Sequence, residues 1–242
     1  ITDWPLILID LYTDEGIVGR SYLEPYATKS MKYLIPALQD FGEMLKGHPV
    51  RPFELYNLAR KSLHFVGYQG MSMIAVAGLD MAAWDALAKA AGMPLCVLLG
   101  GSVGSVNAYN SNGLWLREPE EVAAEAIELR DEGGFTGLKL RLGRDKMRDD
   151  LRTIEAVRNA VGDDMRLMVD FNQGLHLGEA LQRCHAIDDL GLEWIEEPIV
   201  HDNMDGYAQL AAELKTPIQI GENFYGPRDL YTALQKKACD FV

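Results

Sequence analysis

Three acidic residues stand at the ends of short apolar segments in the second half of the chain. Asp170, Glu196 and Glu222 are separated by 26 residues each time, the length of one strand and one helix. In a parallel sheet their carboxylates would lie at one height on neighbouring strands, at the edge that carries the active site in such folds. Carboxylates crowded in this way repel one another, and a bound cation relieves the repulsion. The alternative is that each acid caps a helix or pairs with a basic side chain nearby.

Basic and amide side chains share the ends of these segments. Lys139 and Arg141 are two residues apart, as are Asp170 and Asn172. Because residues i and i+2 of a strand point to one face, the members of each pair point together, and inward-pointing pairs would converge. Ion pairs between the two basic residues and the carboxylates are the structural alternative to a catalytic role. Hard oxygen donors without Cys or His beside them favour Mg2+, also suit Mn2+ and disfavour Zn2+.

The elements that must position these residues follow two different patterns, which meet near residue 104. Residues 5–23 contain two apolar runs around the turn Asp14-Glu15-Gly16, which predicts an antiparallel hairpin. Apolar residues at helical spacing follow, and we expect helices over residues 28–46, 52–61 and 70–91. Together these elements predict an α+β domain over residues 1–104.

From residue 105 the pattern alternates between short strands and amphipathic helices. We expect strands at 105–110, 136–142, 166–171, 193–196 and 217–221, with a sixth beginning at 239. We expect helices at 119–131, 145–161, 178–190, 204–214 and 227–236. Strict alternation implies a parallel sheet with helices packed on it, in either a doubly wound sheet or a barrel.

The overall composition limits the classes of partner. The chain has 242 residues with 36 acidic and 23 basic side chains, a net charge of −13, which repels a phosphate backbone. We find no apolar run near the ~18 residues needed to span a bilayer, so we expect neither a nucleic-acid nor a membrane partner. Three scattered cysteines without a CxxC pair favour a reducing, cytoplasmic environment.

Taken together, the motifs resemble the enolase superfamily, and within it the mandelate racemase subgroup. The resemblance covers nearly the whole chain and rests on Lys139-Leu140-Arg141, Val169-Asp170-Phe171-Asn172-Gln173, Trp194-Ile195-Glu196-Glu197-Pro198, Gly221-Glu222-Asn223, Gly78-Leu79-Asp80-Met81-Ala82-Ala83-Trp84-Asp85 and Pro94-Leu95-Cys96-Val97-Leu98-Leu99-Gly100-Gly101. It implies an N-terminal α+β capping domain over residues 1–104 and a metal-binding TIM-type (β/α) barrel domain over residues 105–242.

The resemblance also implies a reaction. It is abstraction of the proton α to a carboxylate through an enediolate, on an α-hydroxy acid or acid sugar, by a racemase or a dehydratase that commonly forms homo-oligomers. Its metal ligands would be Asp170, Glu196 and Glu222, with Mg2+ as the cofactor. Lys139 and Arg141 stand at the positions of the family's catalytic residues on the corresponding strand. Asn172 and Ser111 match positions that help to hold the substrate.

One residue departs from the pattern of the subgroup. Close relatives have a second lysine, a catalytic base, where this chain has Arg141. A guanidinium with a pKa above about 12 is a poor proton acceptor near neutrality. Two-base racemisation is therefore disfavoured, whereas a one-base elimination of water would survive. We interpret Arg141 as an electrostatic or carboxylate-binding group; the alternative is a catalytically impaired metal-binding pseudoenzyme.

The remaining candidates are weaker. The acid–base histidine and its aspartate partner of the family come from strands six and seven, beyond Val242, and His176 and His201 are minor candidates for substrate contact. Residues 105–242 hold only about five of the eight units of a closed barrel. We therefore expect the natural protein to start roughly 30 residues before Ile1 and to continue on the order of 100 past Val242. The run 100–104 matches a G-x-S-x-G elbow, but its strand and helix come in the reverse order, which disfavours serine hydrolysis.

Overall fold

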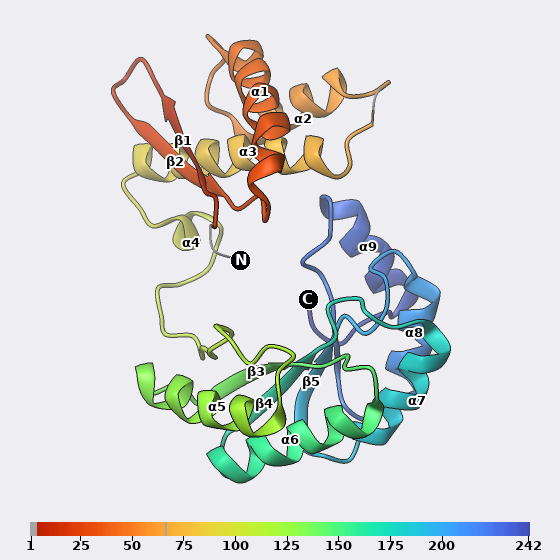
Figure 1. Ribbon diagram of the computed structural model, residues 1–242. Helices are drawn as coiled ribbons and strands as arrows, with labels where there is room; N and C mark the ends of the chain where they lie inside the picture. The colour runs from red at the N-terminus through yellow and green to blue at the C-terminus, as the bar shows by residue number, and fades with distance from the viewer. Residues whose placement is uncertain (1–3, 66) are drawn as a thin grey trace. The chain divides into compact units, whose positions relative to one another are not determined.

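The chain divides into two compact units, Ile1–Ser105 and Val106–Val242. The computed structural model, shown in Figure 1, describes residues 4–65 and 67–242. The division falls one residue beyond the boundary expected from the sequence. Ile1, at the head of the first predicted domain, lies outside the described residues.

The described part of unit 1 is a hairpin with helices, as predicted. Its elements are β1 (Ile7–Tyr12), β2 (Val18–Leu23), α1 (Thr28–Leu45), α2 (Pro52–Ser62), α3 (Met71–Ala90) and the short α4 (Leu95–Leu98), which the sequence analysis did not predict. The two strands pair antiparallel, with Leu8 opposite Tyr22. Gly16 closes the turn between them with a φ of +77°, a conformation that glycine adopts without steric cost.

Helix α3 packs directly on the hairpin because glycines remove side chains at the contact. A Cβ atom on Gly19 would overlap the carbonyl oxygen of Ala82, and one on Gly78 would lie 2.6 Å from Ile9 Cδ1. Ser21 Oγ donates a hydrogen bond of 2.6 Å to the carbonyl oxygen of Gly78 at this close approach. The backbones of β2 and α3 thus approach each other closely at these glycines.

The apolarity of α3 corrects one expectation. The helix has 20 residues and contains an 18-residue stretch with a mean hydropathy of 1.3, so by length and composition alone it could cross a membrane. The expectation that no segment approaches this length is therefore wrong. Half of this apolar stretch of α3 is buried inside the structure. The helix contacts both strands as well as α1 and α2. Its buried apolar residues, such as Met73, Val76 and Leu79, are part of the core of unit 1.

We expect Gly19→Ala to lower the free energy of unfolding of unit 1 by about 2 to 3 kcal/mol, because the added methyl group meets backbone rather than a movable side chain. Gly42→Ala in α1 is the control, since nothing lies within 4 Å of its Cβ position and alanine favours a helix by about 1 kcal/mol. Urea unfolding curves of the two variants measure both effects. Equal stability of the two variants would contradict the packing described for Gly19.

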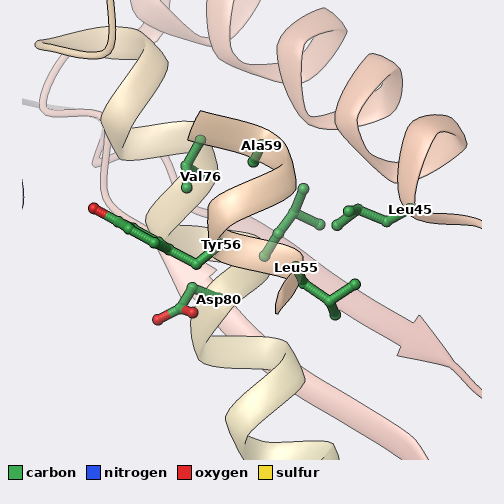
Figure 2. A pocket seen from close by; sticks show the side chains of 7 residues that line it. Leu45, Leu55, Tyr56, Ala59, Val76 and Asp80 are labelled. Carbon is green, nitrogen blue, oxygen red and sulfur yellow. The ribbon is translucent and has the colours of Figure 1, made fainter. Parts of the chain in front are cut away.

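A small, mostly apolar hollow between α1, α2 and α3 contains one carboxylate. Leu45, Leu55 and Val76 line it together with Tyr56 and Asp80 (Figure 2). Asp80 is half-buried, and this burial raises the pKa of its carboxyl group above the ordinary value of 3.8. The folded state therefore holds the Asp80 proton more tightly than the unfolded chain, and the contribution of Asp80 to stability falls as pH rises through these pKa values.

Asp80→Asn is expected to raise the unfolding temperature at pH 7, because the amide carries no charge to desolvate in the hollow. The gain should shrink as pH falls toward 3.8, where the wild-type carboxyl group also becomes neutral. Asp40→Asn, on an exposed position of α1, serves as the control. Thermal unfolding followed from pH 3 to pH 8 tests this, and a gain that does not change with pH would refute it.

Unit 2 consists of alternating strands and helices. Its described strands are β3 (Gly137–Arg141), β4 (Arg166–Asp170), β5 (Leu192–Glu196) and β6 (Ile218–Gln219), and its helices are α5 (Pro119–Gly133), α6 (Met147–Val161), α7 (Leu177–Ile187), α8 (Met204–Glu213) and α9 (Pro227–Lys236). The strands form one parallel sheet in the order β3-β4-β5-β6. In Figure 1 the helices of this unit lie along the outer side of the sheet. The strands therefore lie in the sheet in the same order as in the chain, and the helices lie outside it. This arrangement is that of a (β/α) barrel and not that of a doubly wound sheet.

Two of the expected strands do not form as regular strands. In the segment 105–110 only Asn110 makes an isolated bridge, with Leu138, because the residues before it are exposed and have no buried face to hold them on the sheet. In the segment 239–242 only Phe241 makes a bridge, with Gln219. The other strands and all the predicted helices are confirmed, with ends that differ by up to three residues.

Candidate functional site

The carboxyl ends of β3, β4 and β5 bring one cation and two carboxylates together. Register places Asp170 opposite Glu196 on neighbouring strands. Lys139 Nζ lies 3.1 Å from Asp170 Oδ2 and 2.7 Å from Glu196 Oε1. All three side chains are less than 10% exposed, so their charges are poorly screened by water. The ion pairs considered for Lys139 in the sequence analysis therefore form.

Lys139 is a cation in this setting. Burial acts to lower the pKa of its ammonium group, but the charges and hydrogen bonds of Asp170 and Glu196 outweigh burial, so that the pKa is raised above 10.5. A lysine with a raised pKa holds its proton at neutral pH and is a poor general base. Its chemistry here is that of a fixed positive charge with hydrogen-bond donors.

The second oxygens of the two carboxylates are also hydrogen-bonded. Trp194 Nε1 donates to Glu196 Oε2 at 3.1 Å. The backbone N–H of Asn172 donates to Asp170 Oδ1 at 2.8 Å, and its side-chain amide donates to Oδ2 at 3.1 Å. Asn172, predicted as a substrate contact, thus holds a predicted metal ligand in place.

The third predicted ligand, Glu222, follows β6 and does not touch the other two. Burial raises the pKa of its carboxyl group, and the like charges of Asp170 and Glu196 raise it further. Within residues 4–65 and 67–242, no three His, Cys, Asp or Glu side chains lie close enough together to form a ready metal site. The structure therefore brings two of the three predicted ligands together, and the three-carboxylate site stays a prediction.

The donor set nevertheless suits a hard divalent cation. Asp170 and Glu196 direct oxygen atoms toward the same point, the position of the Lys139 ammonium. The repulsion that raises the pKa of Glu222 comes from these two carboxylates and would be offset by a cation between them. Oxygen ligands of this kind favour Mg2+.

Arg141 makes its hydrogen bonds to a neighbouring loop, while its charge acts to lower the pKa of the Glu222 carboxyl group against the raising effect of burial. Its Nη1 atom donates to the carbonyl oxygens of Ser111 at 2.9 Å and Gly113 at 3.3 Å, and its Nη2 atom donates to Ser111 Oγ at 3.1 Å. The guanidinium carbon lies 4.8 Å from the centre of the Trp115 ring. Among the residues that the structure describes, Arg141 makes no ion pair, so it ties the 111–115 loop to β3 instead of neutralising an acid.

Glu197, which directly follows the predicted metal ligand Glu196, is a further functional candidate. It is buried, and desolvation raises the pKa of its carboxyl group to about 7 against the opposing hydrogen bonds of Gln173 and Asn223. Gln173 Nε2 donates to Glu197 Oε2 at 2.8 Å. Glu197 Oε1 has no hydrogen-bond partner in the described part of the chain.

The two histidines near this edge differ in their surroundings, and their contact with a substrate stays a prediction. The backbone N–H of His201 donates to Gln173 Oε1 at 3.0 Å, and its ring packs edge-on against Tyr225 with centroids 6.2 Å apart. His176 precedes the first residue of α7 at its N-terminal cap.

A buried ion cluster behind the β3 end was not foreseen from the sequence. Asp150 on α6 pairs with Arg183 on α7 at 2.8 Å and with Arg144 at 3.3 Å. Asp150 also accepts hydrogen bonds of 3.2 Å from the backbone N–H of Gly143. The cluster fixes the loop that leaves β3 directly after Arg141. Because the partners lie on different elements, no local spacing could have indicated the cluster.

Fold and site together define a (β/α)-barrel protein with an α+β N-terminal unit and an acidic site at the carboxyl ends of its strands. Two family models match the chain: the N-terminal domain of mandelate racemase / muconate lactonizing enzyme over residues 1–100, and the enolase C-terminal domain-like model over residues 121–242. The chain belongs to the mandelate racemase / muconate lactonizing enzyme family of the enolase superfamily. This confirms the resemblance inferred from the sequence.

Known proteins resemble the chain over nearly its whole length. It is 39% identical over 242 residues to L-talarate/galactarate dehydratase of Salmonella typhimurium, covering 100% of this chain and 61% of the relative. A crystal structure of an enolase from the alpha-proteobacterium bal199 with bound Mg matches with 66% identity and a TM-score of 0.94, over 98% of this chain and 66% of that one. An enolase from Bradyrhizobium complexed with magnesium and mandelic acid matches with 38% identity and a TM-score of 0.92, over 98% and 65%. The chain thus spans about three fifths of the length of the curated relative.

Lys139→Met is expected to lower the free energy of unfolding of unit 2 by about 3 to 5 kcal/mol, because two buried carboxylates lose their shared counter-charge. Lys215→Met removes an ion pair to Asp189 that is more than three quarters exposed, and should cost no more than about 1 kcal/mol. Urea unfolding at pH 7 compares the two variants. A loss below about 1 kcal/mol for Lys139→Met would mean that the ion pairs do not hold the site together.

Proposed function

We propose that this protein is a Mg2+-dependent dehydratase of acid sugars, which removes the proton α to the substrate carboxylate and then eliminates water. The observation that carries the proposal is the buried Lys139 ammonium between Asp170 and Glu196 at the carboxyl edge of the sheet. The likeness to L-talarate/galactarate dehydratase supports the reaction class, and the two similar structures with Mg support the cofactor.

Asp170, Glu196 and Glu222 would hold the Mg2+ through carboxylate oxygens. When bound, Mg2+ stabilises the negative charge that builds on the substrate carboxylate as the α-proton leaves. Asn172 and Trp194 keep the first two carboxylates oriented through their hydrogen bonds. Asp170 and Glu196 are almost wholly buried, and their low exposure to water strengthens the charge interactions that these two carboxylates make.

Lys139 would bind the substrate carboxylate directly. An ammonium group has three N–H donors, and Asp170 and Glu196 face two of them, which leaves a third for the substrate. A fixed positive charge at this position stabilises the same developing negative charge. Ser111, held by Arg141, and Asn172 are proposed to contact the hydroxyl groups of the substrate.

Arg141 favours dehydration over racemisation. Two-base racemisation needs a proton acceptor on each face of the α-carbon, whereas the guanidinium is a donor without acceptor capacity and is engaged with backbone carbonyls. Elimination of water can proceed with one base.

The second candidate function is racemisation of an α-hydroxy acid. It is supported by the likeness to the Bradyrhizobium enolase that is complexed with mandelic acid. The relatives compared are named for enzymes or bind an α-hydroxy acid, which gives no support to a pseudoenzyme. The expected homo-oligomer and cytoplasmic location stay predictions.

The reaction is tested by incubating the protein and Mg2+ in deuterated water with aldaric acids, aldonic acids and mandelate. We expect a 2-keto-3-deoxy acid from at least one acid sugar, with loss of the product on chelation and recovery with added Mg2+. Glu196→Gln should lower kcat/KM by about 10³-fold, because one oxygen donor to the cation is lost. Glu193→Gln, on the same strand but paired with Arg166, is the matched control and should retain activity.

Each other result has a defined meaning. Inversion of mandelate without any keto acid would replace dehydration by racemisation. Neither α-proton exchange nor product from any acid would overturn the enzymatic proposal. Activity that survives chelation would overturn the proposed role of Mg2+.

A further inference from the structure

Just beyond the carboxylates, a second set of contacts joins the loops that follow β4 and β5. The side-chain amide of Gln173 donates to Glu197 Oε2 at 2.8 Å, and the backbone N–H of Gln173 donates to the carbonyl oxygen of Glu197 at 2.7 Å. The other end of the same amide, Gln173 Oε1, accepts the backbone N–H of His201 at 3.0 Å. One glutamine side chain thus connects the β4 loop to two points of the β5 loop.

The backbone at these positions is strained. Asn172, Gln173 and Glu197 have φ angles of +45°, +61° and +37°, in the left-handed region that residues with a side chain rarely adopt. Such a conformation is energetically unfavourable and persists only where its surroundings enforce it. The Gln173 contacts provide that enforcement for both loops.

This backbone conformation also determines how a predicted metal ligand is oriented. The left-handed turn at Asn172 lets both its backbone N–H and its side-chain amide donate to the carboxylate of Asp170. In the neighbouring loop the left-handed Glu197 directly follows Glu196, and its backbone N–H donates to the carbonyl oxygen of Gln219 on β6. The conformations of the two loops therefore help to fix the orientation of Asp170 and Glu196.

Stability alone does not account for Glu197. Its side chain is 1% exposed, and within the described residues one of its oxygens has no hydrogen-bond partner. A buried carboxyl group with an unpartnered oxygen is destabilising compared with an apolar side chain of similar size. A position that carries this cost beside a candidate ligand is better explained by function.

We propose that Gln173 and Glu197 are positioning residues: their mutual hydrogen bond fixes the β4 and β5 loops so that Asp170 and Glu196 present their carboxylates to one cation. The inference rests on the proposed Mg2+ site and deepens it. Neither residue is required to touch the substrate. Outer partners of metal ligands typically change metal affinity by 10- to 100-fold when they are lost.

The test is the dissociation constant for Mg2+ alone, measured by titration calorimetry without substrate. Gln173→Met keeps the side-chain length and removes both hydrogen bonds, and we expect the dissociation constant to rise at least about tenfold. Gln173→Glu replaces the donor amide by a carboxylate that faces the carboxylate of Glu197, and it should raise the dissociation constant in the same way. Glu197→Gln keeps an acceptor for Gln173 and should stay within about threefold of wild type.

In the double variant with Gln173→Glu and Glu197→Gln, the residue at position 197 donates the hydrogen bond and the residue at position 173 accepts it. The dissociation constant for Mg2+ should return to within about threefold of wild type. Two substitutions that act independently on stability would not produce this rescue. Gln209→Met is the matched control, because Gln209 donates at 2.8 Å to Glu213 on the exposed surface of α8. It should leave Mg2+ binding unchanged.

The outcomes separate the two levels of the proposal. A wild-type protein that neither binds Mg2+ nor exchanges an α-proton refutes the proposed function. Wild-type binding of Mg2+ that Gln173→Met leaves unchanged, even with a lower unfolding temperature, refutes the positioning role alone. If the Gln173 variants do not fold, Gln173→Asn decides, because it keeps the amide and shortens its reach: a raised dissociation constant supports the role, and an unchanged one overturns it.

Discussion

The arrangement of unit 2 depends on one constraint, the compensation of buried negative charge at the carboxyl edge of its sheet. Asp170 and Glu196 are forced together by strand register, and Lys139 from the third strand supplies the opposite charge. Buried charges in low dielectric are costly unless they are paired and hydrogen-bonded. The Trp194 and Asn172 hydrogen bonds complete this requirement. The pKa of the Glu222 carboxyl group is raised by desolvation first and then by the like charges of Asp170 and Glu196.

The same constraint separates the roles of two basic residues that look equivalent in the sequence. Lys139, a compact charge on a flexible stem, can approach two carboxylates at once. Arg141 has a planar group with several donors, and it contacts the carbonyl oxygens of the 111–115 loop and the Trp115 ring. Lys139 compensates the negative charge of the site, whereas Arg141 donates hydrogen bonds to backbone carbonyl groups of the loop beside it.

The meeting of Asp170 and Glu196 could be predicted from the sequence because the repeat of strand and helix places these residues at a constant spacing. Asp170 and Glu196 meet as their 26-residue spacing indicates. The orientation of Arg141 and the cluster around Asp150 were not accessible, since their partners are set by tertiary packing rather than by periodicity. The segment 105–110 illustrates the same limit: its composition suits a strand, but a strand forms only where a neighbour and a buried face exist.

The match between strand order and chain order has a consequence for how the site comes into being. Asp170 and Glu196 each belong to a strand that pairs with the one synthesised just before it. During translation β3 would provide Lys139 first, β4 then adds an acid that this cation can neutralise, and β5 adds the next. The positive charge of Lys139 is therefore introduced first, and the growing sheet does not have to bury the two acids before their counter-charge is in place.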